Sequence, residues 1–469
     1  MVSGRAAVLR SYARKLLDGN IRAQMKGPEE RNCSTWNIPE VGSDGPRANL
    51  QRTEPNPRYS LGCQGLSRFC NRIHFFFGMR GESVGWYARL TLQNHGGFHM
   101  NKADISVPSD FLFGEVPASP RVTGPAPAPP SLGPLAAFVG NWSGNGFNTI
   151  FRPDQPSNGS DNILELNLTS ENLSFSPALG AVPNRGLLQP DIFLNGVPYL
   201  QVISDVTNPG QPVGIHVEPG IWIAIPTTTD PAEVPTVARM ASIPHGTTIE
   251  AQGTSVSFSG APTIPPVSIT PNVGGAPVPF PSQTAATPSQ FRIPQDLGPF
   301  IAAGTITQAM LDDPNTVLRN HINGQKIIAT TAISISTSPT APITGGGTDN
   351  IAFLQGGLPT NQPNAQAVQM SATFWIETVE EVIQIPVFTP GQPPLSIKGA
   401  DDGSGRPIPQ FLVRPPIGIP VPRPITITFT QIQYSQNVTL FFNGLSWPHV
   451  SVATLVKSDG IVVNPTGGW

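Results

Sequence analysis

A seven-residue stretch, Gly140-Asn141-Trp142-Ser143-Gly144-Asn145-Gly146, constrains the fold more than any other part of this sequence. It places three glycines around a tryptophan, directly after the chain stops being rich in proline. A glycine beside a large aromatic residue lets a strand bend sharply, while the ring closes off one end of a barrel interior. We therefore expect the first strand of a small-molecule-binding β-barrel here.

Composition favours short strands joined by turns. The chain has 469 residues, and its 54 prolines and 47 glycines are too many for a helical architecture. The net charge of −3 gives no reason to expect nucleic acid or an anionic membrane as a partner. No stretch reaches the length of apolar sequence that a membrane-spanning helix needs, so we expect no integral membrane segment.

Residues 1–116 form a basic extension for which we expect a poorly ordered structure. Positions 1–110 hold 15 of the 27 basic residues and all three cysteines (Cys33, Cys63 and Cys70). Three cysteines make no complete disulfide set, and no Cys/His cluster there has zinc-like spacing. The first 25 residues are of the Arg-rich presequence type and lack a secretory apolar run, which predicts a cytoplasmic or mitochondrial location.

A Pro/Ala-rich linker at 117–134 separates this extension from residues 135–460, where period-two alternation predicts strands. About 10–12 strands with hairpin-like spacing fit a closed antiparallel barrel, which leaves no exposed sheet edge. Two Pro/Gly-rich insertions, at 260–298 and 387–424, are expected to be loops around the barrel. Residues 306–322 carry a helical signal with Asp313 as N-cap, and we expect a short helical lid over the barrel mouth. The predicted strands cover residues 163–169, 173–176, 199–206, 213–217, 220–225, 236–243, 247–259, 326–337, 366–377, 379–386, 424–434 and 438–445, the last continuing into 450–457.

The motif Gly140-x-Trp142-x-Gly144-x-Gly146 resembles the GxWxGxG signature of the nitrobindin-like heme-binding β-barrels, whose calycin-like shape relates them to fatty-acid-binding proteins and lipocalins. In that family the signature lies on the first strand, and a histidine near the C-terminal end of the barrel holds the heme iron. His449, within Leu445–Ala453, falls in the matching place. The stretch Gly214–Trp222 is similar to the family's central strand pair. The segment from about 132 to 460 is longer than compact nitrobindins. We expect its insertions to reshape or cover the pocket, which would change the residues that contact the ligand.

The resemblance implies heme b as cofactor and His449 as metal ligand, with His216, Trp142, Trp222 and Trp447 as further cofactor-binding residues. Independently of it, a heme iron needs a neutral imidazole in an apolar cavity, with its second nitrogen oriented by a hydrogen bond. His449 lies in sequence among Trp447, Val450, Val452 and Leu455, which predicts an apolar setting of that kind. An ordinary core histidine remains the alternative.

Arg239 and His245 are the candidate catalytic residues. An Arg and a His above a heme can polarise a bound peroxide, the His moving a proton and the Arg stabilising developing charge. The alternative is a surface histidine in a turn and an Arg239 paired with Glu218 or Glu250. His216 and Glu218 share one strand face by alternation, so either a supporting pair or an ion pair in the core is predicted besides ligation.

Other chemistries find little support, because the sequence has no GxSxG elbow, P-loop or HExxH motif. Two hypotheses remain. The first is a heme-binding barrel with peroxidase or nitrogen-oxide chemistry. The second is a carrier of an apolar small molecule, of the lipocalin or fatty-acid-binding type, in which the histidines are structural.

Overall fold

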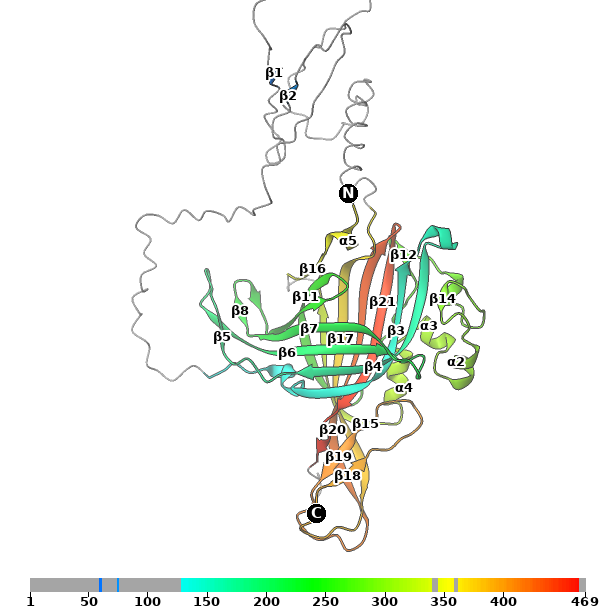
Figure 1. Cartoon of the computed structure of the whole chain (residues 1–469). Coiled ribbons are helices and arrows are strands. Elements are labelled where there is room, and N and C mark those ends of the chain that lie inside the picture. The colour runs from blue at the N-terminus through cyan, green and yellow to red at the C-terminus, as the bar shows by residue number, and fades with distance from the viewer. Residues whose placement is uncertain (1–58, 61–73, 76–127, 340–344, 358–361, 464–469) are drawn as a thin grey trace, which may run out of the picture. The chain divides into compact units, whose positions relative to one another are not determined.

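The computed structural model describes residues 59–60, 74–75, 128–339, 345–357 and 362–463 (Figure 1). The chain divides into two compact units, Met1–Arg121 and Val122–Trp469. In the first unit, the described residues form the short antiparallel strands β1 (Tyr59–Ser60) and β2 (His74–Phe75). The rest of the predicted extension, with its cysteines and presequence-like segment, lies outside the described residues, as does the linker before residue 128.

The second unit is built around a closed antiparallel barrel. Each strand of the described wall pairs with the next one along the chain, and the last pairs back with the first. The predicted fold class is therefore confirmed, with ten strands in the wall of the described barrel. They are β3 (Gly140–Pro153), β4 (Asn162–Phe175), β6 (Ile192–Asp205), β7 (Val213–Ile225), β10 (Thr236–Ile243), β11 (Thr247–Ser259), β15 (Lys326–Ser336), β17 (Gln366–Ile385), β20 (Arg423–Phe442) and β21 (Leu445–Lys457).

The glycines of the opening motif lie at the seam where β3 meets β21. A Cβ on Gly144 would stand 2.0 Å from the carbonyl oxygen of Thr454, and one on Gly146 would stand 1.9 Å from that of Val452. No larger residue fits without moving the backbone, because such separations are far below van der Waals contact. The two glycines therefore permit the close approach that closes the barrel.

Trp142 closes one end of the interior, as the glycine-aromatic pattern predicts. Its indole Nε1 donates a hydrogen bond of 2.6 Å to the carbonyl oxygen of Phe138, which follows the 3-10 helix η2 (Gly133–Ala137). The Phe138 ring stacks on Phe175 with centroids 4.8 Å apart. Both rings belong to a large buried cluster of inward-facing apolar side chains, and we call this end of the barrel the plugged end.

Five predicted strand boundaries are wrong. Four predicted breaks lie inside continuous strands: 163–169 and 173–176 form β4, 213–217 and 220–225 form β7, 366–377 and 379–386 form β17, and 424–434 and most of 438–445 form β20. Buried polar side chains such as Glu171, which is 1% exposed, break the alternation that the prediction used. The predicted strand 438–445 is instead interrupted by a turn at Asn443-Gly444, where φ is +49° and +73°, and the next strand already begins at Leu445. Both residues have the positive φ of a tight hairpin turn, for which Asn-Gly is strongly preferred.

The insertion at 260–298 and the helices after it cover the outer wall of the barrel. Outward side chains of β3, β4 and β21 form a buried cluster with Leu297, Leu311 and Leu318. The predicted helical lid is therefore wrong in its position, because its apolar residues pack against the wall and not over the mouth. The elements concerned are β12 (Asn272–Val273), β13 (Ala276–Pro277), η4 (Pro281–Gln283), β14 (Arg292–Ile293), α2 (Gly298–Ala303), α3 (Gln308–Asp312) and α4 (Thr316–Ile322).

The insertion at 260–298 is ordered by one buried cation. Arg292 is fully buried, and its guanidinium donates to the carbonyl oxygens of five surrounding residues: Ser282, Thr284, Thr287, Pro294 and Gln295. Charge-assisted hydrogen bonds of this kind satisfy backbone groups that a loop without regular structure would leave unpaired. This internal order differs from the predicted simple loop.

The second insertion also contains structure. β18 (Leu395–Lys398), β19 (Gln410–Val413) and β22 (Ile461–Val462) form a small sheet. Figure 1 shows this sheet beside the projecting end of β20. Its apolar side chains form a third buried cluster with the ends of β17 and β20. The remaining described elements are η3 (Pro156–Asn158), β5 (Val182–Asn184), β8 (Thr228–Thr229), β9 (Ala232–Glu233), β16 (Gly347–Asn350) and α5 (Ala352–Gln355). Within the described ranges, no helix has both the length and the apolar character for crossing a membrane.

Candidate functional site at the barrel mouth

The end of the barrel opposite Trp142 carries the predicted histidines. In the β21–β3 ladder Lys457 pairs with Trp142 and Val450 with Thr149, so His449 lies at the far end from the plug. The β10–β11 turn with His245 and the first part of β7 with His216 lie at the same end. His245 is exposed and the His216 side chain is 14% exposed, so this end is open to solvent. We call it the mouth.

His449 faces the barrel interior on β21. Ala453 and Leu455, which share its side of the strand, belong to the interior cluster, whereas Val450 and Val452 belong to the outer one. Burial, with smaller contributions from His216 and His245, lowers the pKa of His449 from 6.5 to about 3. The imidazole is therefore neutral at physiological pH.

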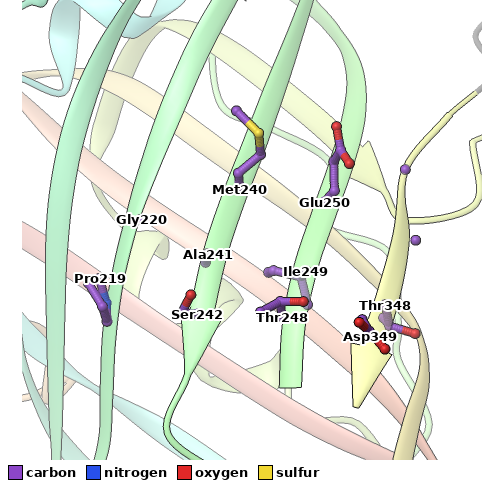
Figure 2. A pocket seen from close by; sticks show the side chains of 12 residues that line it. Pro219, Gly220, Met240, Ala241, Ser242, Thr248, Ile249, Glu250, Thr348 and Asp349 are labelled. Carbon is purple, nitrogen blue, oxygen red and sulfur yellow. The ribbon is translucent and has the colours of Figure 1, made fainter. Parts of the chain in front are cut away.

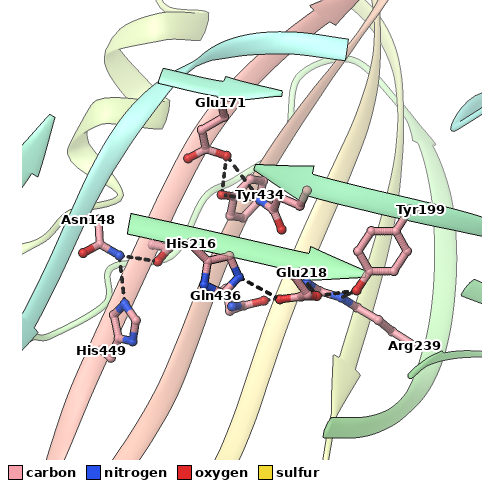
Figure 3. A network of polar contacts seen from close by, with 11 residues as sticks. Asn148, Glu171, Tyr199, His216, Glu218, Arg239, Tyr434, Gln436 and His449 are labelled. Carbon is pink, nitrogen blue, oxygen red and sulfur yellow. Dashed lines mark hydrogen bonds and ion pairs between the residues drawn. The ribbon is translucent and has the colours of Figure 1, made fainter. Parts of the chain in front are cut away.

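Asn148 holds the His449 ring in place. Its Nδ2 lies 2.8 Å from Nε2 of His449 (Figure 3) and 2.7 Å from Oγ of Ser451. Its Oδ1 accepts a hydrogen bond from Asn167. An amide nitrogen can only donate, so Nε2 of His449 is the acceptor and Nδ1 carries the proton.

A buried ion pair lies beneath the mouth. Nη2 of Arg239 pairs with Oε1 of Glu218, and the two side chains are 2% and 0% exposed. The other guanidinium nitrogens donate to Tyr199 Oη at 2.8 Å and to Gln436 Oε1 at 2.7 Å. Arg239 therefore has the alternative role that the sequence allowed, a partner of Glu218. His216 approaches the other carboxylate oxygen, with Nε2 3.1 Å from Oε2 (Figure 3).

Glu218 and Arg239 each stabilise the charged form of the other. Burial alone raises the pKa of Glu218, but the charge of Arg239 and the hydrogen bond from His216 outweigh it and lower the pKa to about 2. Burial likewise opposes the charge on Arg239, and Glu218 outweighs it, which raises the pKa of Arg239. Burial raises the pKa of Tyr199. Glu218 is thus an ionised acceptor and Tyr199 a neutral donor at physiological pH.

A second buried carboxyl group was missed by sequence reasoning. Glu171 accepts hydrogen bonds from Tyr434 Oη at 2.6 Å, from Thr169 Oγ1 at 3.1 Å and from Gln201 Nε2 at 3.3 Å. Burial raises the pKa of Glu171, against the opposing effect of these donors. The sequence did contain a signal for it: Glu171 keeps the period-two spacing of the strand across the gap that the prediction placed between 169 and 173. Together with Glu218 and Arg239 it forms a polar layer across the interior (Figure 3).

His245 lies in the β10–β11 turn beside His216. The two ring centroids are 6.0 Å apart with planes inclined by 34°. Burial, followed by the neighbouring His216, lowers the pKa of His245. The structure thus gathers His216, His245 and His449 at one end of the barrel and places Arg239 deeper. Among the residues that the structure describes, no group of three or more His, Cys, Asp or Glu side chains is arranged to hold a metal ion.

The predicted tryptophans occupy different places. Trp142 and Trp222 belong to the interior cluster, and Trp222 lies next to Arg239, with the guanidinium carbon 5.8 Å from the ring centroid. Trp447 belongs to the outer-wall cluster, where it stacks on Phe442 at 4.5 Å and contacts Phe151. The structure therefore does not bring Trp447 together with His449, although only Pro448 separates them in sequence.

A separate groove of about 510 Å³ lies over β7, β10, β11 and β16 (Figure 2). In the ladder Met240 pairs with Glu250, and Thr248 with Asp349, so these side chains share the outer face of the wall. The groove is thus distinct from the mouth. Its lining consists of Pro219, Gly220, Met240, Ala241, Ser242, Thr248, Ile249, Glu250, Gly346, Gly347, Thr348 and Asp349.

No protein-family model matches the chain, and comparison with curated proteins gave no match. Among solved structures, the chain is similar to the crystal structure of Rv2717c from M. tuberculosis. The TM-score is 0.28 and the sequence identity 12%, with 70% of this chain and 98% of the other covered. A similarity at this level carries no conclusion about function.

Proposed function

We propose that the barrel binds heme at its mouth, with His449 as the axial ligand. The observation that carries the proposal is a neutral imidazole facing inward on the last barrel strand, at the open end. The resemblance of Gly140–Gly146 to the GxWxGxG signature of nitrobindin-like barrels supports the same assignment. Bound heme would supply an iron site for small ligands such as nitrogen oxides or peroxide.

The residues at the mouth fit an axial imidazole. With its proton on Nδ1, His449 presents the unprotonated Nε2 that an iron requires, and it needs no deprotonation at physiological pH. Each of these histidines has an apolar cross-strand neighbour: Val438, 7% exposed, pairs with His449, and Ile203, 5% exposed, pairs with His216. Polar contacts come from Asn148 to His449 and from Glu218 to His216. Asn148 would have to move for a metal to bind, because its Nδ2 lies at the position facing Nε2 of His449.

The apolar-carrier hypothesis finds less support in the geometry. A carrier of the fatty-acid-binding type needs apolar depth below its mouth. Here Glu218, Arg239 and Glu171 cross the interior, and the space beyond them is filled by the aromatic cluster that includes Trp142 and Trp222. A ligand of this barrel is therefore expected at the mouth and not deep inside.

Reconstitution with hemin tests the proposal. The full chain mixed with hemin should develop a Soret band with one heme per chain, and His449→Ala should remove or strongly shift it. Ser451→Ala is the matched control, because Ser451 shares the inward face of β21 and the contact with Asn148 but offers no imidazole. Absence of a Soret band in the wild type, or a band unchanged in His449→Ala, would exclude the assignment.

A further inference from the structure

Glu218 is the most constrained charged group in the interior, and heme ligation by His449 makes no use of it. Its Oε1 accepts hydrogen bonds from both the Arg239 guanidinium and the Tyr199 hydroxyl, and Arg239 cannot rotate away without leaving two buried charges unpaired. Its Oε2 faces the ring of His216. A buried, ionised carboxylate fixed by two donors is thus aimed at one histidine at the mouth.

This contact selects one tautomer of His216. A carboxylate only accepts hydrogen bonds, so Nε2 of a neutral His216 must carry the proton, and Nδ1 then holds a free lone pair. Figure 3 shows the ring between Glu218 on one side and the Asn148–His449 pair on the other. Because the His216 side chain is 14% exposed, a small molecule at the mouth can reach it.

We propose that His216 and Glu218 form an acid–base dyad that serves a small protic oxygen ligand, such as a hydroperoxide, bound at the mouth. In the proposed step the ligand's O–H bond breaks, its proton moves to Nδ1 of His216, and the electron pair stays on the ligand oxygen. The imidazolium keeps its Nε2–H hydrogen bond to Glu218, and returning the proton restores the starting state. The location of the ligand rests on the proposed heme function.

Glu218 and Arg239 are positioning residues in this scheme. Glu218 orients the ring and stabilises the imidazolium, and Arg239 fixes Glu218. Arg239 is a poor candidate for direct contact with a ligand, since it is 2% exposed and each of its three nitrogens donates to Glu218, Tyr199 or Gln436. His245 lies in an exposed turn, where no carboxylate orients it among the described contacts. In this proposal the proton-transfer role that the sequence suggested for His245 belongs to His216, and Arg239 acts through Glu218.

The tautomer of His216 tests the dyad without heme. Long-range ¹⁵N–¹H NMR of the ¹⁵N-histidine-labelled full chain reports which ring nitrogen is protonated, and His216→Gln assigns the signal. The wild type should show the Nε2–H form. In Glu218→Gln the amide oxygen can stay with Arg239 and Tyr199 while the amide NH₂ faces His216, so the tautomer should invert to Nδ1–H. A wild-type Nδ1–H form, or no change in Glu218→Gln, would overturn the dyad.

Hydroperoxide-dependent oxidation of a dye by the hemin-loaded chain tests the proton transfer. His216→Gln and Glu218→Gln should each lower the rate by about 100-fold or more while the Soret band stays, as expected for the loss of a positioned acid–base group. Glu250→Gln changes an exposed carboxylate on the outer face of β11, one strand beyond the neighbour of β7; it is the matched control and should leave the rate unchanged.

The two failures are distinguishable. A normal Soret band with unchanged rates in both variants would refute the dyad and leave heme binding intact. A wild type without a Soret band would refute the heme proposal, and the tautomer measurement would then decide the dyad alone. Should Glu218→Gln fail to fold, His216→Gln keeps the test open, because it retains the Glu218–Arg239 pair.

Discussion

Gly146→Ala should damage the closure of the barrel out of proportion to the size of a methyl group. The new Cβ would stand 1.9 Å from the Val452 carbonyl oxygen and 2.8 Å from the Cα of Ala453. Because real Cβ contacts stay above 3.0 Å, the β3–β21 seam must open by about 1 Å at this point. Overpacking costs about 1–3 kcal/mol, and weakening one ladder hydrogen bond adds about 1 kcal/mol. We expect a loss of about 2–4 kcal/mol in the free energy of unfolding.

Thermal and urea unfolding followed by circular dichroism measure this loss. For a domain of this size, about 2–4 kcal/mol corresponds to a fall in Tm of roughly 3–6 °C. Gly214→Ala on β7 is the control, since nothing lies within 4 Å of its added Cβ and its φ is not in the left-handed region. That substitution should be neutral or stabilise by about 0.4–1 kcal/mol through the unfolded chain. Equal effects of the two substitutions would refute the role assigned to the seam.

Two buried titratable groups on the outer wall predict opposite pH dependences. Burial raises the pKa of Glu377 to about 8, so its contribution to stability is present below about pH 4.5 and is lost as the pH rises toward 8. Glu377→Gln should therefore gain stability over the wild type in urea unfolding at pH 9 but not at pH 4, and a constant difference would contradict the reasoning. Burial lowers the pKa of His321 to about 4, so the wild type should lose about 3 kcal/mol between pH 6.5 and 4 through this residue. The same titration with His321→Gln should be flatter over that range, and a parallel curve would show that His321 does not titrate with folding.

Much of the fold was predictable because its determinants are local. Alternation with period two identifies a strand wherever one face is apolar, and it located most of the barrel wall. It failed at Glu171, where the buried face itself is polar and alternation no longer separates inside from outside. The helical signal at 306–322 was likewise local and appeared in the structure as α3 and α4. The sequence could not show where on the barrel these helices pack. Whether a helix covers a mouth or a wall depends on where other elements leave apolar side chains uncovered, here Phe147 and Val452 on the outer face.

In the candidate site, too, the local pattern predicted some features and tertiary packing decided the others. Alternation placed His216 and Glu218 on one face of β7, and the structure joins them. It could not tell that Trp447 packs on the outer wall while His449 faces inward, because strand position and a neighbouring proline do not reveal how the insertion packs around the start of β21.

By itself, the sequence determined that this chain closes a barrel. The motif from Gly140 to Gly146 combines an aromatic plug with two glycines that only a close strand–strand approach requires, and both properties belong to the residues themselves. Only the tertiary structure decided which polar groups meet inside. Glu171 bonds to Tyr434 across 263 positions of sequence, and Arg239 bonds to Gln436 across 197. Such pairs depend on which strands face each other across the interior, and strand order is fixed by the closure of the whole barrel. The roles proposed for His449 and His216 depend on that closure, because it brings histidines from β21 and β7 to the same end of the barrel.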